Sequence, residues 1–301
     1  MQDNMAMSKD KMIDSIRLHD ASTRGAQFGI KGVFVRPYVS FFVGSIIKRY
    51  PRFVRPLLIL ARNLKLYLLP KRIEWKYSSD GLATKAIMSF MDDPEFQRSY
   101  GRMRVASGAV VDPGLHFRVH QVMWAFSHCF TLEGDFVECG TGRGLMMSAG
   151  LQSLDGWQTS GRRLFLFDTF EPFHIDPDTG YNDPARGIHE KYASSVEAVV
   201  ENFGEWKNVE IVKGRIPEKL PSAGIEKVAF LHIDLNHSTA ECEALRYFWP
   251  MIVSGGVVLL DDYGSNTTQN DAMNSVAAEF GVRILTTGSA QGIVLKPYET
   301  N

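Results

Sequence analysis

The sequence predicts an open, doubly wound α/β sheet that is mostly parallel and seven-stranded, with an N-terminal helical extension. After residue 134, short apolar runs alternate with longer stretches of helical spacing. The runs are almost continuously apolar, which is typical of parallel strands covered by helices on both faces. In chain order they are FVE after Asp135, RLFLFD ending at Asp168, VEIVKG from Val209, VAFLHID ending at Asp234, GGVVLLDD ending at Asp262, VRILTT and GIVLKP.

Helices are predicted before the first strand. From Asp80 onward apolar residues recur at helical spacing, and a second short helix is expected after Pro94. The residues with this spacing are Ala83, Ala86, Ile87, Phe90 and Met91. A further helix is predicted over residues 117–130. Another, LMMSAGLQSL, follows the first strand.

The chain divides in this prediction into an arm of residues 1–75, a helical lead-in and cap of residues 76–133, and a ligand-binding domain of residues 134–301. Residues 21–73 hold eleven Lys or Arg and no Asp or Glu, whereas the whole chain has a net charge of -1. The apolar blocks of this basic arm are shorter than the roughly 18 to 20 residues that a membrane span needs. Two interpretations stay open: the arm lies on an anionic membrane surface, or it packs on the acidic body or on a second subunit. We expect no nucleic-acid partner, because the cations are mixed with aliphatic blocks.

The cysteines and the N-terminal residues of the sequence indicate in which cellular compartment the protein works. Cys129, Cys139 and Cys242 are an odd number without metal-binding spacing, so we expect no disulfide framework and a reducing environment. The first residues lack the basic cluster and apolar region of a signal peptide. We therefore expect a cytoplasmic protein, with the inner membrane face as the surface that the basic arm would contact.

The segment ECGTGRG after the first strand is the clearest ligand signal. Gly140 and Gly142 let the backbone turn tightly and approach a ligand, and the next helix points its positive end to the same place. A dinucleotide fingerprint would read GxGxxG, whereas this spacing is GxGxG, and Glu138 would repel a pyrophosphate. An acid here favours a cationic group, such as the amino group of a methionine moiety. Asp168, at the end of the next strand, is placed to accept both hydroxyls of a ribose, so the pair indicates S-adenosylmethionine.

Three further residues complete the predicted cofactor site. Thr141 lies in the glycine loop and Thr169 follows Asp168. Gly214, after the third strand, fits the next wall of the site, where the chain passes near an adenine.

Acidic residues end the predicted strands. Because ligands bind at the carboxyl ends of strands in such sheets, we expect these carboxylates to converge on one rim. They are Glu138, Asp168, Asp234, Asp261 and Asp262.

These segments resemble the class I S-adenosylmethionine-dependent methyltransferases, and among them the macrocin O-methyltransferase-like (TylF-type) sugar O-methyltransferases. The similar segments are GDFVECGTGRG, LFLFDTFEPF, VKGRIPEKLP and LHIDLNHSTAECEALRYFWPMIVSGGVVLLDDYG, with DGLATKAIMSFMDDPEFQRSY and FRVHQVMWAF upstream. The resemblance covers roughly residues 80 to 297. It implies a Rossmann-like methyltransferase sheet and methyl transfer to a hydroxyl of a sugar or glycosylated metabolite.

The resemblance also implies Mg²⁺ or another divalent cation, held by Asp234, Asp261 and Asp262. Members commonly read D-x-D-L-Y-E where this chain reads DLNHST, so Asn236 stands in place of the second acid and Ser238 in place of the tyrosine.

The chemistry of methyl transfer needs an acceptor hydroxyl that loses its proton as it attacks. A divalent cation held by carboxylates can bind that hydroxyl and stabilise the alkoxide. Asp234 is an alternative proton acceptor, and His237 and His189 are candidates for the same task. The long polar loop EPFHIDPDTGYNDPARGIHEKY after Asp168 is interpreted as a lid over the acceptor.

Two other functions stay open. An NAD-dependent oxidoreductase is disfavoured by Glu138 and by the absence of a Tyr-x-x-x-Lys pair after Asp234. A non-catalytic cofactor-binding protein would have lost catalysis through Asn236 and would use its basic arm for assembly. The expected partners are a small-molecule or glycan acceptor and, as a homo-oligomer, further copies of this chain.

Overall fold

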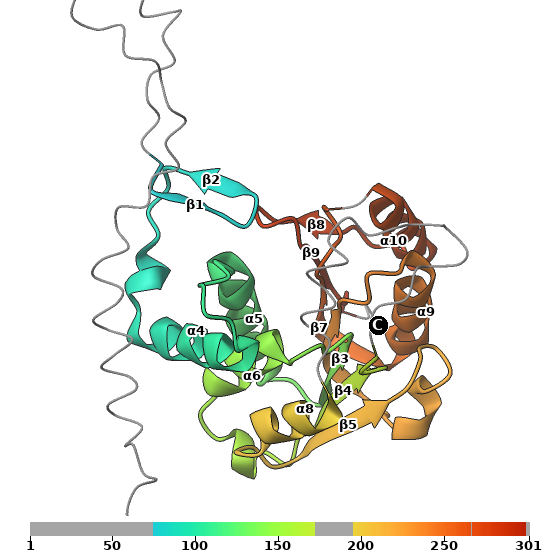
Figure 1. The fold of residues 1–301 in the computed structure, drawn as a ribbon. Helices are drawn as coiled ribbons and strands as arrows, with labels where there is room; N and C mark the ends of the chain where they lie inside the picture. Colours follow the sequence, from blue (N-terminus) through green and yellow to red (C-terminus); the bar gives the residue numbers. More distant parts are fainter. Residues whose placement is uncertain (1–74, 172–194, 266, 299–301) are drawn as a thin grey trace, which may run out of the picture. The chain divides into compact units, whose positions relative to one another are not determined.

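The computed structural model describes residues 75–171, 195–265 and 267–298, and a seven-stranded sheet forms its centre. The strand order is β5-β4-β3-β6-β7-β9-β8 (Figure 1). Strands β3 to β7 pair in parallel, whereas β9 is antiparallel to both β7 and β8. The strands are β3 (Asp135–Cys139), β4 (Leu164–Asp168), β5 (Val209–Lys213), β6 (Val228–Ile233), β7 (Ile252–Leu260), β8 (Leu285–Thr286) and β9 (Gly292–Leu295). The predicted doubly wound, mostly parallel seven-stranded sheet is therefore confirmed.

Helices cover both faces of this sheet. On one face Phe136 and Phe230 pack with α4, α5, α6 and α8 in one buried cluster. On the other face Val137 and Leu231 pack with α9 and α10 in a second cluster (Figure 1). The helices are α4 (Pro94–Ser107), α5 (His116–Cys129), α6 (Leu145–Gln152), α8 (Val196–Phe203), α9 (Ser238–Phe248) and α10 (Thr267–Glu279), with 3₁₀ turns η1 (Ser89–Asp92), η2 (Trp157–Thr159), η3 (Leu220–Ala223) and η4 (Trp249–Met251). Burial on both faces explains why the strands are apolar without alternation.

The helix predicted directly after Asp80 is wrong. The chain instead forms a hairpin of β1 (Tyr77–Ser79) and β2 (Leu82–Thr84), followed only by the short turn η1. Asp80 and Gly81 link the strands with φ angles of 48° and 71°. Positive φ at both central residues is the primed turn that an Asp-Gly pair favours, and it outweighed the helical spacing of the apolar residues after it.

The two other helices predicted before the sheet are confirmed as α4 and α5. Helix α4 starts at Pro94, whose fixed φ suits the first turn, and the Asp93 side chain accepts a hydrogen bond from the Glu95 N–H at 2.9 Å.

Several predictions fall on residues that the structure does not describe. They concern the basic arm of residues 21–73, most of the loop interpreted as a lid, and His189. Among the described helices, none has both the length and the apolar character needed to cross a bilayer.

Gly140 sets how closely strands β3 and β6 approach at their carboxyl ends. Its φ is +91°, and a Cβ at this position would lie 1.8 Å from the carbonyl oxygen of Asp234, directly after β6. The Asp234 N–H also donates to the Cys139 carbonyl at 2.8 Å. Glycine is therefore required here by contact between two backbones, whereas the sequence alone indicated the approach of a ligand.

We expect Gly140→Ala to lower the free energy of unfolding by about 2 kcal/mol or more, because both the backbone angle and the contact with Asp234 oppose a side chain. Gly142→Ala is the matched control. Its φ is +52° and no atom lies within 4 Å of the added Cβ, so it should cost only about 1 kcal/mol. Urea unfolding followed by tryptophan fluorescence measures both, and equal losses would contradict the packing argument.

Candidate active site

The candidate site lies at the carboxyl ends of four neighbouring strands. Glu138 is in β3, Asp168 ends β4, Asp234 follows β6, and Asp261 and Asp262 follow β7. Because β4, β3, β6 and β7 are consecutive in the sheet, all five predicted acids reach one rim. They form two groups there, one around the glycine loop and one around Asp234.

Glu138 is the acid of the first group and is almost fully buried, with 2% of its surface exposed. Its Oε1 accepts a hydrogen bond from Nδ1 of His232 at 3.0 Å. Its Oε2 has no hydrogen-bond partner among the described residues. Burial raises the pKa of Glu138, against the opposing effect of His232. A buried carboxylate oxygen without a donor suits a cationic or N–H-bearing ligand group.

Asp168 holds the glycine loop in place. Its two carboxylate oxygens accept hydrogen bonds from the N–H groups of Gly142 at 2.7 Å and Phe170 at 2.8 Å. Gly214 lies beside it, since the Gly214 N–H donates to the Asp168 carbonyl at 2.9 Å. The structure thus brings together Gly142, Asp168 and Gly214, as predicted for a cofactor site. Space above Gly142 is open, because an added Cβ there meets no atom within 4 Å.

The two predicted threonines also lie at this end of the sheet. Thr141 is buried beside Glu138, with its hydroxyl 3.5 Å from the Phe167 carbonyl oxygen. Thr169 is half-buried, and its hydroxyl accepts from the Glu171 N–H at 3.3 Å.

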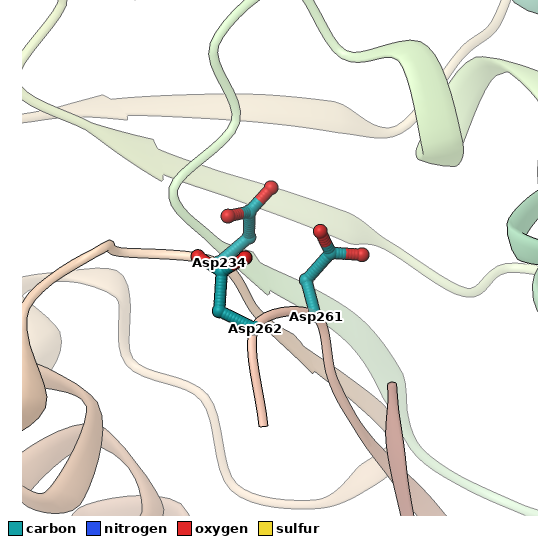
Figure 2. A group of neighbouring side chains, drawn as sticks. All are labelled: Asp234, Asp261 and Asp262. Carbon is teal, nitrogen blue, oxygen red and sulfur yellow. The ribbon is translucent and has the colours of Figure 1, made fainter. Parts of the chain in front are cut away.

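The second group is a cluster of three carboxylates, shown in Figure 2 at the ends of β6 and β7. One oxygen each from Asp234, Asp261 and Asp262 lie within 4.8 Å of one another. Desolvation and the neighbouring charges of Asp261 and Asp262 raise the pKa of Asp234 well above its usual range. Such crowding of anionic oxygens is relieved by a cation, and an all-oxygen set suits Mg²⁺.

Asp261 is contacted by a guanidinium, an amide and a histidine ring. Its Oδ2 accepts from the Arg118 guanidinium, its Oδ1 accepts from the Gln291 amide, and Nε2 of His232 lies 3.6 Å from Oδ1. Burial opposes the ionised form, but Arg118 and His232 hold the pKa of Asp261 well below its usual range. Arg118 in turn binds both carboxylate oxygens of Asp80 in the hairpin turn, at 2.9 and 3.2 Å.

His232 is a fully buried base between the two groups. Burial disfavours its charged form, but its contacts with Asp261 and Glu138 outweigh that effect and raise the pKa of His232 to about 10. The ring lies between the two acids, with Nδ1 3.0 Å from Oε1 of Glu138 and Nε2 3.6 Å from Oδ1 of Asp261.

In the segment after Asp234, His237 and Asn236 both make structural contacts. His237 caps α9, its Nδ1 accepting from the Ala240 N–H at 3.3 Å. Asn236 has a φ of 54°, a conformation that Asn adopts more readily than most residues. Its amide donates to Oδ1 of Asp234 at 3.3 Å. Asn236 therefore supports the Asp234 carboxylate.

Sequence reasoning missed five residues that contact the site acids or their neighbours. His232 had a visible signal, a single basic residue inside the apolar strand VAFLHID, and the Asp80-Gly81 pair is a known turn signal. Glu241 in α9 is buried, accepts from the Gln269 amide at 2.8 Å, and has a pKa raised to about 8 by burial and by the charge of Asp262. The five are Asp80, Arg118, His232, Glu241 and Gln291.

Comparison with known proteins supports the same family as the sequence resemblance. The model of the family described as macrocin-O-methyltransferase (TylF) matches residues 118–283. A demethyldecarbamoylnovobiocin O-methyltransferase from Streptomyces niveus is 28% identical over 160 residues, which are 50% of this chain and 60% of that protein. An 8-demethyl-8-(2,3-dimethoxy-alpha-L-rhamnosyl)-tetracenomycin-C 4'-O-methyltransferase from Streptomyces olivaceus is 27% identical over 160 residues, with the same shares. The chain thus matches less than two thirds of the length of these relatives.

A solved structure supports the fold. The structure of the O-methyltransferase NovP is similar with a TM-score of 0.57 at 20% identity, covering 70% of this chain and 99% of NovP. The family match, which extends from the start of α5 to beyond α10, includes the glycine loop and all five acids at the strand ends. Because that match spans more than half of the 301 residues, the chain belongs to the macrocin O-methyltransferase (TylF) family.

Proposed function

We propose that this protein transfers a methyl group from S-adenosylmethionine to a hydroxyl of a sugar or glycosylated metabolite, with the help of a divalent cation. The observation that carries the proposal is the adjacency of the two groups of acids. The unpaired oxygen of buried Glu138 lies on β3, and the cluster around Asp234 follows β6, the next strand in the sheet. The family supports the reaction class.

The residues around the glycine loop fit the methyl donor. Oε2 of Glu138 would accept from its amino group, and Asp168 would accept from the ribose hydroxyls, since each carboxylate oxygen can accept more than one hydrogen bond. The open space above Gly142 lets the ligand lie against the backbone. When bound, S-adenosylmethionine supplies an electrophilic methyl group.

The cluster of Asp234, Asp261 and Asp262 fits a divalent cation, because one carboxylate oxygen from each of the three converges within 4.8 Å. When bound, Mg²⁺ stabilises negative charge on an oxygen beside it. As an alternative to holding the cation, Asp234 is a candidate acceptor for the proton of the attacking hydroxyl. His237 and His189 stay predictions for the same task.

The acceptor class is inferred from the relatives. The name of the Streptomyces olivaceus relative specifies 4'-O-methylation of a rhamnosyl compound. A hydroxyl of a sugar or glycosylated metabolite is therefore the acceptor that we propose for this chain.

We expect S-adenosylhomocysteine to bind the wild-type protein and to bind Glu138→Gln and Asp168→Asn about 10-fold or more weakly, because each change removes a charged acceptor. Isothermal titration calorimetry measures the affinity. Asp155→Asn is the control, since Asp155 is exposed and outside the site. Unchanged affinity in both site variants would overturn the cofactor assignment. NADH binding in a fluorescence titration, without binding of S-adenosylhomocysteine, would favour the oxidoreductase.

For the metal, we expect EDTA to abolish transfer of labelled methyl groups to a pool of glycosylated metabolites and Mg²⁺ to restore it. Asp262→Asn should weaken Mn²⁺ binding, measured by electron paramagnetic resonance, because it removes one of three anionic ligands. Asp271→Asn, an exposed acid on α10, is the control. Full activity in EDTA would exclude metal assistance. Cofactor binding without any metal-stimulated transfer would favour the non-catalytic interpretation.

A further inference from the structure

One buried side chain contacts acids of both groups. His232 lies in β6 with none of its surface exposed, and in the sheet register it is paired with Glu138 of β3. Nδ1 of its ring is 3.0 Å from Oε1 of Glu138. Nε2, on the other side of the ring, is 3.6 Å from Oδ1 of Asp261.

The two acids serve different halves of the proposed site. Glu138 has its second oxygen without a partner, in the region proposed for the methyl donor. Asp261 belongs to the carboxylate cluster proposed for the cation. Both acids are buried, and the His232 ring lies between them.

We propose that His232 is a positioning residue that orients Glu138 toward the methyl donor and Asp261 toward the cation, and so links the two binding sites. This inference rests on the function proposed above. It assigns His232 no contact with either ligand.

The physical reason is the rigidity of the imidazole ring. Its two nitrogens are at a fixed separation, so one ring orientation sets both contacts at once. Partners of this kind orient the groups that bind a metal, and their loss typically weakens metal affinity about 10- to 100-fold. On the Glu138 side, loss of the imidazole removes the donor 3.0 Å from Oε1 of a buried carboxylate.

The two contacts can be separated by substitution. The side-chain amide of Asn reaches about as far as Nδ1, so His232→Asn keeps a donor toward Glu138 and loses the one toward Asp261. The amide of Gln reaches about as far as Nε2, so His232→Gln does the reverse. His232→Phe fills the space and removes both donors.

We expect His232→Asn to weaken Mn²⁺ binding about 10-fold or more while affinity for S-adenosylhomocysteine changes by less than about 3-fold. His232→Gln should show the opposite selectivity, and His232→Phe should weaken both ligands. Calorimetry with S-adenosylhomocysteine in EDTA and electron paramagnetic resonance with Mn²⁺ alone measure the two affinities in the full-length protein. Neither measurement requires turnover.

Phe230→Leu is the matched control. Phe230 is two residues earlier in β6, is fully buried and stacks near the His232 ring, with 6.5 Å between ring centroids. It should lower the melting temperature and leave both affinities intact. If the Asn and Gln variants weaken both ligands equally, or no more than Phe230→Leu does, the inference is overturned and His232 is only a core residue.

Failure of the proposed function gives a different result. In that case the wild-type protein itself binds no S-adenosylhomocysteine or no Mn²⁺, before any substitution at His232. If His232→Phe does not fold, the opposite selectivities of the Asn and Gln variants still decide the question.

Discussion

The contact between the chain segments after β3 and β6 is the constraint on which the rest of the site depends. Strand order reverses at this pair, because β4 and β5 lie on one side of β3, and β7 and β9 lie on the other side of β6. Ligands of open α/β sheets bind at such a switch point. Gly140 allows the two segments to touch at Asp234. The glycine loop and the carboxylate cluster therefore share one rim of the sheet.

A run of alternating charges crosses this rim. It begins at Asp80 in the hairpin, continues through Arg118 and Asp261, and ends with His232 and Glu138. Burying so many charges is costly, and apolar residues of similar size would often give a more stable protein. Within this run, Arg118 and His232 hold the pKa of Asp261 well below its usual range although its carboxyl is buried.

The strands, their order along the chain and the acids at their ends were predictable, because buried parallel strands are continuous apolar runs and their carboxyl ends share an edge. Contacts between distant side chains were not. Arg118 meets Asp261 across 143 positions of sequence, and no local pattern reports such a pairing. The hairpin was missed because the apolar residues after Asp80 recur at helical spacing. The stretch with that spacing is too short to form a helix. Gly140 was correctly singled out, although a neighbouring backbone explains it without any ligand. Residue type alone also could not show that His237 caps a helix.

The Asp80 contact has a consequence for where the functional unit begins. The family match starts at Arg118, yet the guanidinium of that residue is shared between Asp261 and a turn 38 positions earlier in the chain. A fragment or chimera that began at Arg118 would keep this guanidinium but lose Asp80, one of the two carboxylates that it binds. Arg118 would then be free to bind Asp261 with its whole donor set, in competition with any metal. The boundary of the family match and the electrostatic boundary of this site are therefore different, because the hairpin turn shares Arg118 with Asp261 although it precedes residues 118–283.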